Sequence, residues 1–405
     1  MISLKLNFNY TDIFRAPRLA LSGKKIIILI KGNLIGYISY FLFSLISLAS
    51  TGMNTKEVIA KYGLYPCLFG HSAEWYSWTI YYIGIIIWFL AILFSLTGVS
   101  RVLLKQLKGD DYFSGKDAWQ YIYKHWHAIV FTPITLFLII VFFLLIASLF
   151  ALIGKIPILG KLTFSILYIV YFFGSIFTIL TAFVFISSLF YTPSIVGIYE
   201  EDTMGSVFQT YSITFSQIWR IITYNFLLFI LIIIGLEFFS WFCLNSVGLI
   251  SYIFSLKFFM GNQFINLNNY SLSLVVPNVI QDTIFYYKAI ILETLNLKSG
   301  LPYFFNNTIN YLNLRDMSLL DTISSIFLSL AYFIIGLSIL SYGLAIFAVG
   351  ESLMFITFKK LSDDDDLILR KDEDDEDDED DEDNGYNNLE SNFQKLSKDS
   401  LYEEE

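Results

Sequence analysis

The chain has 405 residues, of which 56% are hydrophobic and 15% are charged. Soluble domains are about 45–50% apolar and about 25% charged, so this composition excludes a soluble globular protein and indicates an integral membrane protein. Its two cysteines exclude a disulfide-rich scaffold and a cysteine-based zinc site. The net charge of -10 is unevenly distributed, because 21 acids and four basic residues follow Leu361 and the preceding part of the chain carries +7.

Residues 1–25 are polar and basic, and their few apolar positions recur at helical spacing. A helix that starts near Thr11 and Asp12 has one apolar face and one basic face, which predicts a short interfacial helix on the membrane surface. We expect the first membrane span at about 26–50 and the second at about 76–100, joined by a polar loop.

The same pattern returns after the second span. Ser114 and Asp117 have the spacing of a helix capping box, and apolar and basic side chains then recur at helical spacing as far as His127. This predicts a second interfacial helix, followed by a span at about 128–153. After a tight turn, a longer span is expected at about 163–191.

A third interfacial helix is predicted where an acidic turn at 200–202 precedes an amphipathic segment that ends at Arg220. A fifth span follows at about 221–242. Residues 243–320 are rich in asparagine and are expected to form an outer excursion, with a sixth span at about 321–358.

Basic residues near the span ends predict the orientation. Thirteen of them flank the ends that share a side with the N-terminus, and four lie in the two short loops on the other side. By the positive-inside rule, both termini are cytoplasmic. The expected fold is an all-α membrane protein of about six spans, with three cytoplasmic interfacial helices, three degenerate repeats and a disordered acidic tail at 361–405.

Three segments carry a resemblance to a known group of proteins: DIFRAPRLALSGKK at 12–25, GDDYFSGKDAW at 109–119 and PSIVGIYEEDTMGSVFQTYSITFSQIWR at 193–220. They resemble bacterial polytopic membrane proteins that include the membrane domain fused to some glycerophosphodiester phosphodiesterases. The resemblance covers roughly the first 240 residues, without the hydrolase domain. It implies a helical membrane fold in the bacterial cytoplasmic membrane, and no activity.

Ionisable residues inside spans are candidate functional residues, since a charge at a helix centre costs about 2.5–3.5 kcal/mol on insertion scales. Lys31 and Glu351 lie at matching depths in the first and last spans. We expect either an ion pair that joins these helices or two side chains that reach the cytoplasmic interface separately. Glu237, near the outer end of the fifth span, is either solvated there or couples proton or ion movement.

Cys67 and Cys243 are both expected on the outer side of the membrane. They form either a disulfide in an oxidising compartment or two buried free thiols.

Basic side chains on the interfacial helices are candidate contacts for anionic lipid headgroups: Arg15, Arg18, Lys25, Lys116 and Lys124. Each gains about 1 kcal/mol near an anionic membrane surface. The same residues also fit an ordinary positive-inside pattern without lipid preference.

The tail contains the run DEDDEDDEDDED at 372–383, whose self-repulsion and lack of apolar residues prevent a packed core. It is expected to be solvated, or to bind a basic protein partner or a divalent cation. In the second case the free tail competes with anionic lipid for the basic helices and releases them when the basic partner or cation binds it, and that competition weakens with salt.

The sequence contains no Walker loop, nucleophile elbow, zinc-protease motif or dinucleotide fingerprint, so we predict no catalytic, cofactor-binding or metal-binding residue and no nucleic-acid partner. The leading expectation is a non-enzymatic membrane protein that organises lipid or recruits partners at the cytoplasmic face. A transporter of a lipid or small solute is the first alternative, supported by the repeat and the intramembrane charges. A membrane-embedded enzyme is the second.

Overall fold

The structure is a computed structural model that describes residues 6–157, 159–276 and 318–370. All regular elements in these ranges are helical. Six helices are long and apolar enough to cross a membrane, which confirms the prediction of an all-α, multi-pass membrane protein. These helices are α2 (Gly23–Ser50), α4 (Trp75–Lys108), α5 (Gly115–Ile153), α6 (Leu159–Ser194), α8 (Ile218–Ser255) and α11 (Leu319–Asp363).

Shorter helical elements connect or cover the long ones. They are η1 (Tyr10–Arg15), α1 (Ala16–Ala20), α3 (Thr55–Tyr62), the π-helical turn η2 (Ile195–Tyr199), α7 (Thr203–Ser216) and α9 (Asn262–Val275).

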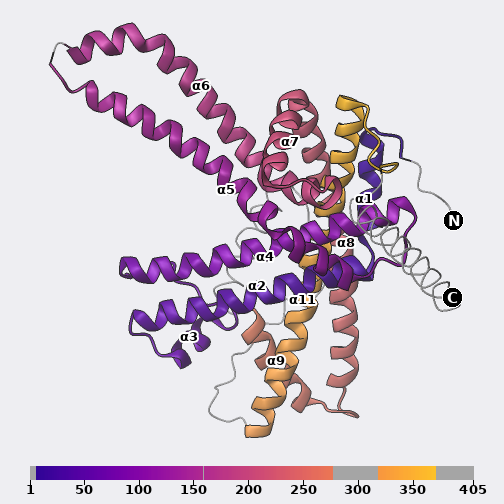
Figure 1. Cartoon of the computed structure of the whole chain (residues 1–405). Helices are drawn as coiled ribbons and strands as arrows, with labels where there is room; N and C mark the ends of the chain where they lie inside the picture. Colours follow the sequence, from indigo (N-terminus) through magenta and orange to yellow (C-terminus); the bar gives the residue numbers. More distant parts are fainter. Residues whose placement is uncertain (1–5, 158, 277–317, 371–405) are drawn as a thin grey trace, which may run out of the picture.

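The long helices form three pairs that leave a shared centre in different directions: α2 with α4, α5 with α6, and α8 with α11 (Figure 1). We call this centre the hub. It contains the first turns of α2, α5 and α8, the last turns of α4, α6 and α11, and the short elements η1, α1 and η2. One continuous apolar cluster joins them, with members that include Ile28, Val102, Ile122, Tyr191, Leu228 and Phe355. The six helix ends that the charge pattern assigns to one side of the membrane therefore meet in one core.

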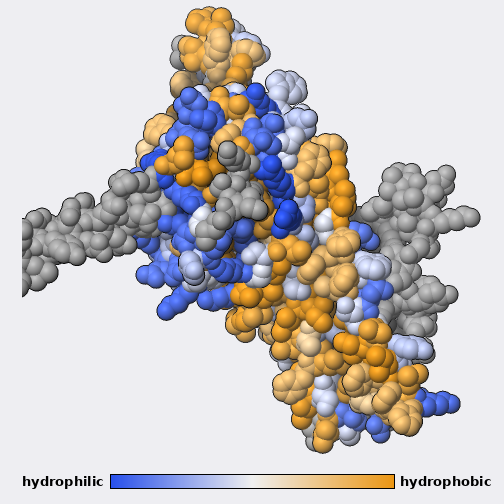
Figure 2. Space-filling view, turned by 90° about the vertical axis from the view of Figure 1, so that its right-hand side faces the viewer, coloured by the Kyte–Doolittle hydropathy of each residue, from blue (hydrophilic) through white to orange (hydrophobic). Residues whose placement is uncertain are grey.

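The distribution of hydrophilic and hydrophobic side chains on the surface also separates the hub from the projecting helices. Figure 2 shows hydrophilic side chains gathered at the level of the hub, whereas the part below it, formed by α8, α9 and α11, is mainly hydrophobic. An apolar exterior of this kind is expected where helices face lipid.

The α2–α4 pair is the most closely packed, and small residues allow the close approach. A Cβ atom added to Gly36 would lie 2.4 Å from Cδ1 and 3.0 Å from Cα of Trp88. Farther from the hub, Tyr40 donates a hydrogen bond to the Pro66 carbonyl at 2.6 Å, and its ring lies 6.0 Å from that of Tyr81. These contacts hold the loop between the two helices against the pair.

The first predicted interfacial helix is half-buried: Phe14 and Arg18 are exposed, its other face enters the hub, and its place on the membrane surface stays a prediction. Residues 10–20 form η1 and α1, which bury Ile13 and Ala16 in the hub. The buried Asp12 carboxylate accepts the Asn7 N–H at 2.8 Å, so this segment enters the core with its acid partnered.

The second predicted interfacial helix is continuous with the following span in α5. The predicted capping box is confirmed, because Ser114 accepts hydrogen bonds from the backbone N–H groups of Lys116 and Asp117, and Asp117 accepts from Ser114. Non-helical backbone angles at His125 mark a kink where the surface helix and the span were expected to separate.

The third predicted interfacial helix is the separate helix α7, capped by Asp202, whose carboxylate accepts the Gly205 N–H at 2.7 Å. Its buried face contains Val207, Thr210 and Ile213 and lies against α5 and α6. Large apolar side chains on its other face, such as Phe208, are exposed. The short polar residues face inward because they allow α7 to approach its neighbours closely.

Two helices continue beyond the predicted boundaries of their spans. Helix α8 continues to Ser255 instead of ending near 242, and α9 follows within the predicted excursion. At the other end, α11 reaches Asp363, and Leu367 is buried in the hub core, so ordered structure continues beyond the predicted tail boundary at 361. The remaining residues of the excursion, 277–317, and of the tail, 371–405, lie outside the described residues.

Replacing Gly36 tests the packing of α2 against α4. We expect Gly36→Leu to lower the free energy of unfolding by about 1–3 kcal/mol, because the new side chain meets the backbone of Trp88. The measurement is the thermal unfolding midpoint of the purified protein in one detergent. Gly336→Leu is the matched control, since a Cβ there meets nothing within 4 Å. Equal midpoints for the two variants would contradict this packing.

Candidate functional site

The hub contains an unusual number of buried ionisable side chains. Each of these residues is at most 9% exposed: Asp12, Lys25, Arg101, Lys105, Glu351 and Lys359. Burying a charge is costly unless it is paired and hydrogen-bonded, so these side chains must either stabilise the hub through partners or serve a function.

Arg101 is the central charge of the hub. Its guanidinium forms an ion pair with Glu200, and both side chains are buried. The guanidinium also lies over the ring of Tyr121, with 4.5 Å between its carbon and the ring centroid. The Tyr121 hydroxyl in turn donates a hydrogen bond to the Val196 carbonyl at 2.6 Å. Arg101 thus joins α4, α5 and the chain around η2.

The η2 turn approaches α4 so closely that only glycine fits. A Cβ atom on Gly197 would lie 2.8 Å from the Thr97 carbonyl oxygen, a backbone atom of α4. This contact places Glu200 beside Arg101, with Glu200 in the left-handed backbone region at φ 62°. A π-helical turn with such a residue is locally strained, as is common at functional positions.

Buried hydroxyl groups connect three of the long helices. Ser352 of α11 bonds to Ser100 of α4 at 2.9 Å and to Ser194 of α6 at 3.2 Å. Hydrogen bonds between small hydroxyl side chains at such crossings commonly stabilise the packing of membrane helices.

The five predicted lipid contacts divide into three groups. Lys25 is fully buried, and its ammonium donates to the Leu19 carbonyl and the Gln106 Oε1, each at 2.8 Å, so contact with a lipid headgroup is wrong for this residue. Arg15 is half-buried and pairs with Asp12 at 3.2 Å. Arg18, Lys116 and Lys124 are exposed, and their contact with anionic lipid stays a prediction.

Lys31 and Glu351 are not brought together. The Lys31 side chain is exposed, and its ammonium lies 4.9 Å from the centroid of the Trp119 ring. Glu351 is 1% exposed, and its carboxylate interacts with the Tyr191 hydroxyl. The predicted pair fails because matching depth along two helices does not make their faces meet: residues such as Gly32 and Asn33, not Lys31, face the interior from α2.

Glu237 is exposed near the middle of the 38-residue helix α8, because this helix is longer than predicted. Its place at the outer end of a span and its role in coupling stay predictions. Cys67 and Cys243 are both free thiols, so the disulfide alternative is not realised.

Sequence reasoning missed the attachment of the tail to the hub. Lys108 donates a hydrogen bond to the Arg370 carbonyl at 2.6 Å, and the Arg370 guanidinium lies 4.6 Å from the ring centroid of Tyr199. Leu367 is buried. In the sequence it follows a run of acids and precedes basic residues. The Lys360 ammonium beside Asp364 lowers the pKa of that carboxyl through a direct hydrogen bond, which stabilises the turn after α11. The apolar residues at 367–369 were the feature of the sequence that could have predicted this attachment.

In the described ranges, no group of three or more His, Cys, Asp or Glu side chains is placed to hold a metal ion. No protein-family model, curated protein or solved structure matches this chain. The resemblance to phosphodiesterase-associated membrane domains stays an expectation, and any function rests on the geometry of the hub and its surroundings.

Loss of Arg101 tests the hub directly. We expect Arg101→Leu to destabilise the protein by about 3–5 kcal/mol, because Glu200 would stay buried with its main charged partner removed. The double variant Arg101→Leu, Glu200→Leu should be more stable than the single one. Both are compared with Arg220→Leu, an exposed arginine bonded to Gln217, by denaturant titration in mixed micelles. Purely additive effects would contradict a direct pair.

Glu351 should behave in the opposite way. We expect Glu351→Met to raise the free energy of unfolding by about 1–3 kcal/mol, because it removes a buried carboxyl whose partner, the Tyr191 hydroxyl, carries no positive charge. Glu351→Gln should leave stability nearly unchanged. The measurement compares the thermal unfolding midpoints of both variants with that of the wild-type chain. Marked destabilisation by the Met substitution would show that the carboxyl supports the fold.

Proposed function

We propose that this protein is a non-enzymatic membrane platform that organises anionic lipid and recruits basic partners at the side of the membrane where the hub lies. In this proposal both termini are cytoplasmic, the membrane is the bacterial cytoplasmic membrane, and no cofactor is involved. The observation that carries it is the attachment of the tail to the hub through Leu367 and Arg370.

Attachment gives the acidic run a defined starting point. Asp372 follows Arg370 by two residues, so the run begins within about 7 Å of chain from the Lys108 contact. Exposed basic side chains surround the hub, including Arg18, Lys24, Lys116 and Lys124. Opposite charges held at such short range attract each other, although salt screens the attraction.

The acidic run and anionic lipid headgroups then compete for the same basic side chains around the hub. A basic partner that binds the run frees these cations for lipid, so partner recruitment and lipid organisation become opposite sides of one equilibrium. No step in this scheme needs a catalytic residue.

Transport of a lipid or small solute is the second candidate, and Glu351 favours it. Carboxyl groups buried within membrane helices mark proton or ion pathways in many transporters. Its burial beside the Tyr191 hydroxyl, without an ion pair to any described residue, is difficult to explain by stability alone. Transport predicts loss of flux in proteoliposomes for Glu351→Gln, whereas the platform predicts unchanged lipid retention.

The tail proposal is tested by comparing the full chain with a version that ends at Arg370, which keeps the attachment. Solubilised from vesicles of phosphatidylglycerol and phosphatidylcholine, the shorter version should retain more phosphatidylglycerol per protein, because its hub cations are no longer neutralised. Mass spectrometry counts the bound lipid. The difference should disappear at high salt, and a decalysine peptide should raise retention by the full chain.

The matched control replaces the acids of 372–383 with serine and asparagine at constant length. It should retain lipid like the shorter version, since the proposal depends on charge and not on chain length. Equal phosphatidylglycerol retention by the full chain, the control and the shorter version would refute the proposed competition.

A further inference from the structure

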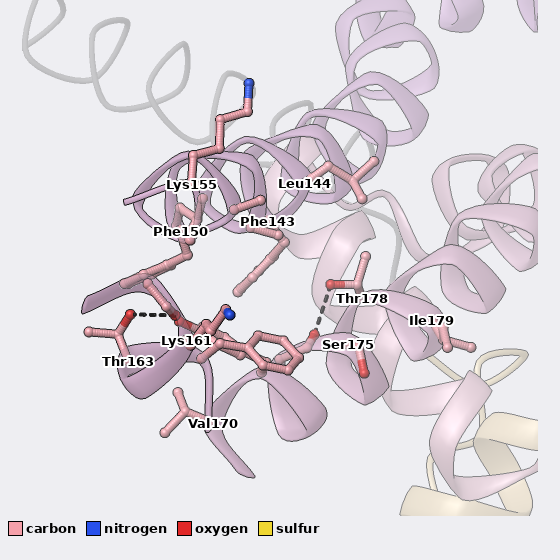
Figure 3. Close-up of a pocket in the computed structure, with 18 residues that line it drawn as sticks. Phe143, Leu144, Phe150, Lys155, Lys161, Thr163, Val170, Ser175, Thr178 and Ile179 are labelled. Atoms are coloured by element: carbon pink, nitrogen blue, oxygen red, sulfur yellow. Dashed lines mark hydrogen bonds between the residues drawn. The ribbon is translucent and has the colours of Figure 1, made fainter. Parts of the chain in front are cut away.

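The halves of α5 and α6 that lie far from the hub form a hairpin that projects away from the rest of the molecule (Figure 1). A groove with a volume of about 960 Å³ runs between them near the hairpin turn (Figure 3). Small-molecule sites typically have volumes of about 300–1,000 Å³, so this groove is large enough for a ligand.

Aromatic rings from both helices brace the groove. Phe143 lies 5.0 Å from Phe177, and Phe150 lies 5.6 Å from Tyr171, measured between ring centroids. Small residues between the rings create its depth. A Cβ atom added to Gly174 meets nothing within 4 Å, so the space beside this glycine is open.

The hydroxyl groups in the groove are already occupied by their own helix. Ser175 donates to the Phe172 carbonyl at 2.8 Å, and Thr178 donates to the Gly174 carbonyl at 2.8 Å. The groove wall therefore behaves as an apolar surface.

The charged groups of the groove are two lysines at the hairpin turn, Lys155 and Lys161. Both are exposed, and no carboxylate in the described ranges pairs with either of them. In Figure 3 the Lys161 ammonium lies among the lining side chains, whereas Lys155 points away from them. One end of an apolar groove thus presents a positive charge at the turn between two spans, which is where lipid headgroups lie.

We propose that this groove binds an anionic phospholipid of the surrounding bilayer, with an acyl chain between α5 and α6 and the phosphate at Lys161. The charge pattern fits such a lipid, because the phosphate supplies the negative charge that Lys161 lacks and the acyl chain matches the apolar wall. This site lies at the opposite end of the spans from the hub and its tail, so it goes beyond the proposed function.

The test is titration of the purified full chain with dioleoyl phosphatidylglycerol or dioleoyl phosphatidylcholine, with bound lipid counted by native mass spectrometry. Gly174→Leu fills the groove and should remove one tightly bound lipid. Gly336→Leu is the matched control, because it adds the same side chain to open space on α11. The tightly bound lipid should remain in the control.

A second variant tests the headgroup without changing the groove. Lys161→Gln should weaken phosphatidylglycerol binding about fivefold, toward the affinity for phosphatidylcholine, while Lys155→Gln should have a smaller effect. Equal binding of the two lipids to the wild-type chain, or retention of the bound lipid in Gly174→Leu, would overturn the proposal. Deleting residues after Arg370 should leave this site unchanged, which separates it from the tail equilibrium.

Discussion

The buried Arg101 guanidinium is the constraint on which the hub depends. A charge excluded from water must be partnered, and Arg101 finds its partners in Glu200 and the ring of Tyr121, which come from two other parts of the chain. Meeting that requirement fixes the end of α4 against the start of α5 and the turn that follows α6. The close approach of Gly197 to α4 and the hydroxyl contacts of Ser352 follow from the same arrangement. All three helix pairs contact each other there, and farther out α2 also packs against α11, with 4.5 Å between the ring centroids of Tyr37 and Phe333.

Local signals in the sequence predicted local structure well. Hydropathy located six long helices because an apolar run of sufficient length has few alternatives in a membrane. The capping box at Ser114 was predictable because its two members are three residues apart. The end of α8 was not, because the helix continues through the polar residues Asn245 and Ser246 as far as Ser255.

Contacts between distant residues were the part that could not be predicted. Arg101 and Glu200 are 99 residues apart, and in the sequence each looks like an ordinary charged residue at the end of its own segment. The sequence suggests that Lys25 is a lysine at the membrane surface, yet its ammonium donates hydrogen bonds to a carbonyl oxygen and an amide oxygen inside the hub. Glu351 shows the reverse error, because depth along a helix is readable from the sequence while the direction of a side chain is set by packing.

The two ends of the molecule suggest a division of labour. We propose that the charges of the hub and the acidic tail form an electrostatic equilibrium that partners and lipids shift. At the α5–α6 turn lies an apolar groove with a lysine at its end, which we propose to face the opposite membrane surface. Both depend on the same premise, that the hub and the hairpin turns lie on opposite sides of the bilayer.

Site-directed thiol labelling in sealed vesicles of one orientation tests that premise most directly. In a chain with Cys67 and Cys243 replaced by serine, single cysteines are placed at the exposed positions Tyr112, beside the hub, and Phe69 and Ile156, at the far turns. The account predicts that an impermeant maleimide modifies Phe69→Cys and Ile156→Cys from one side and Tyr112→Cys only from the other. Labelling of Tyr112→Cys and Ile156→Cys from the same side would contradict it.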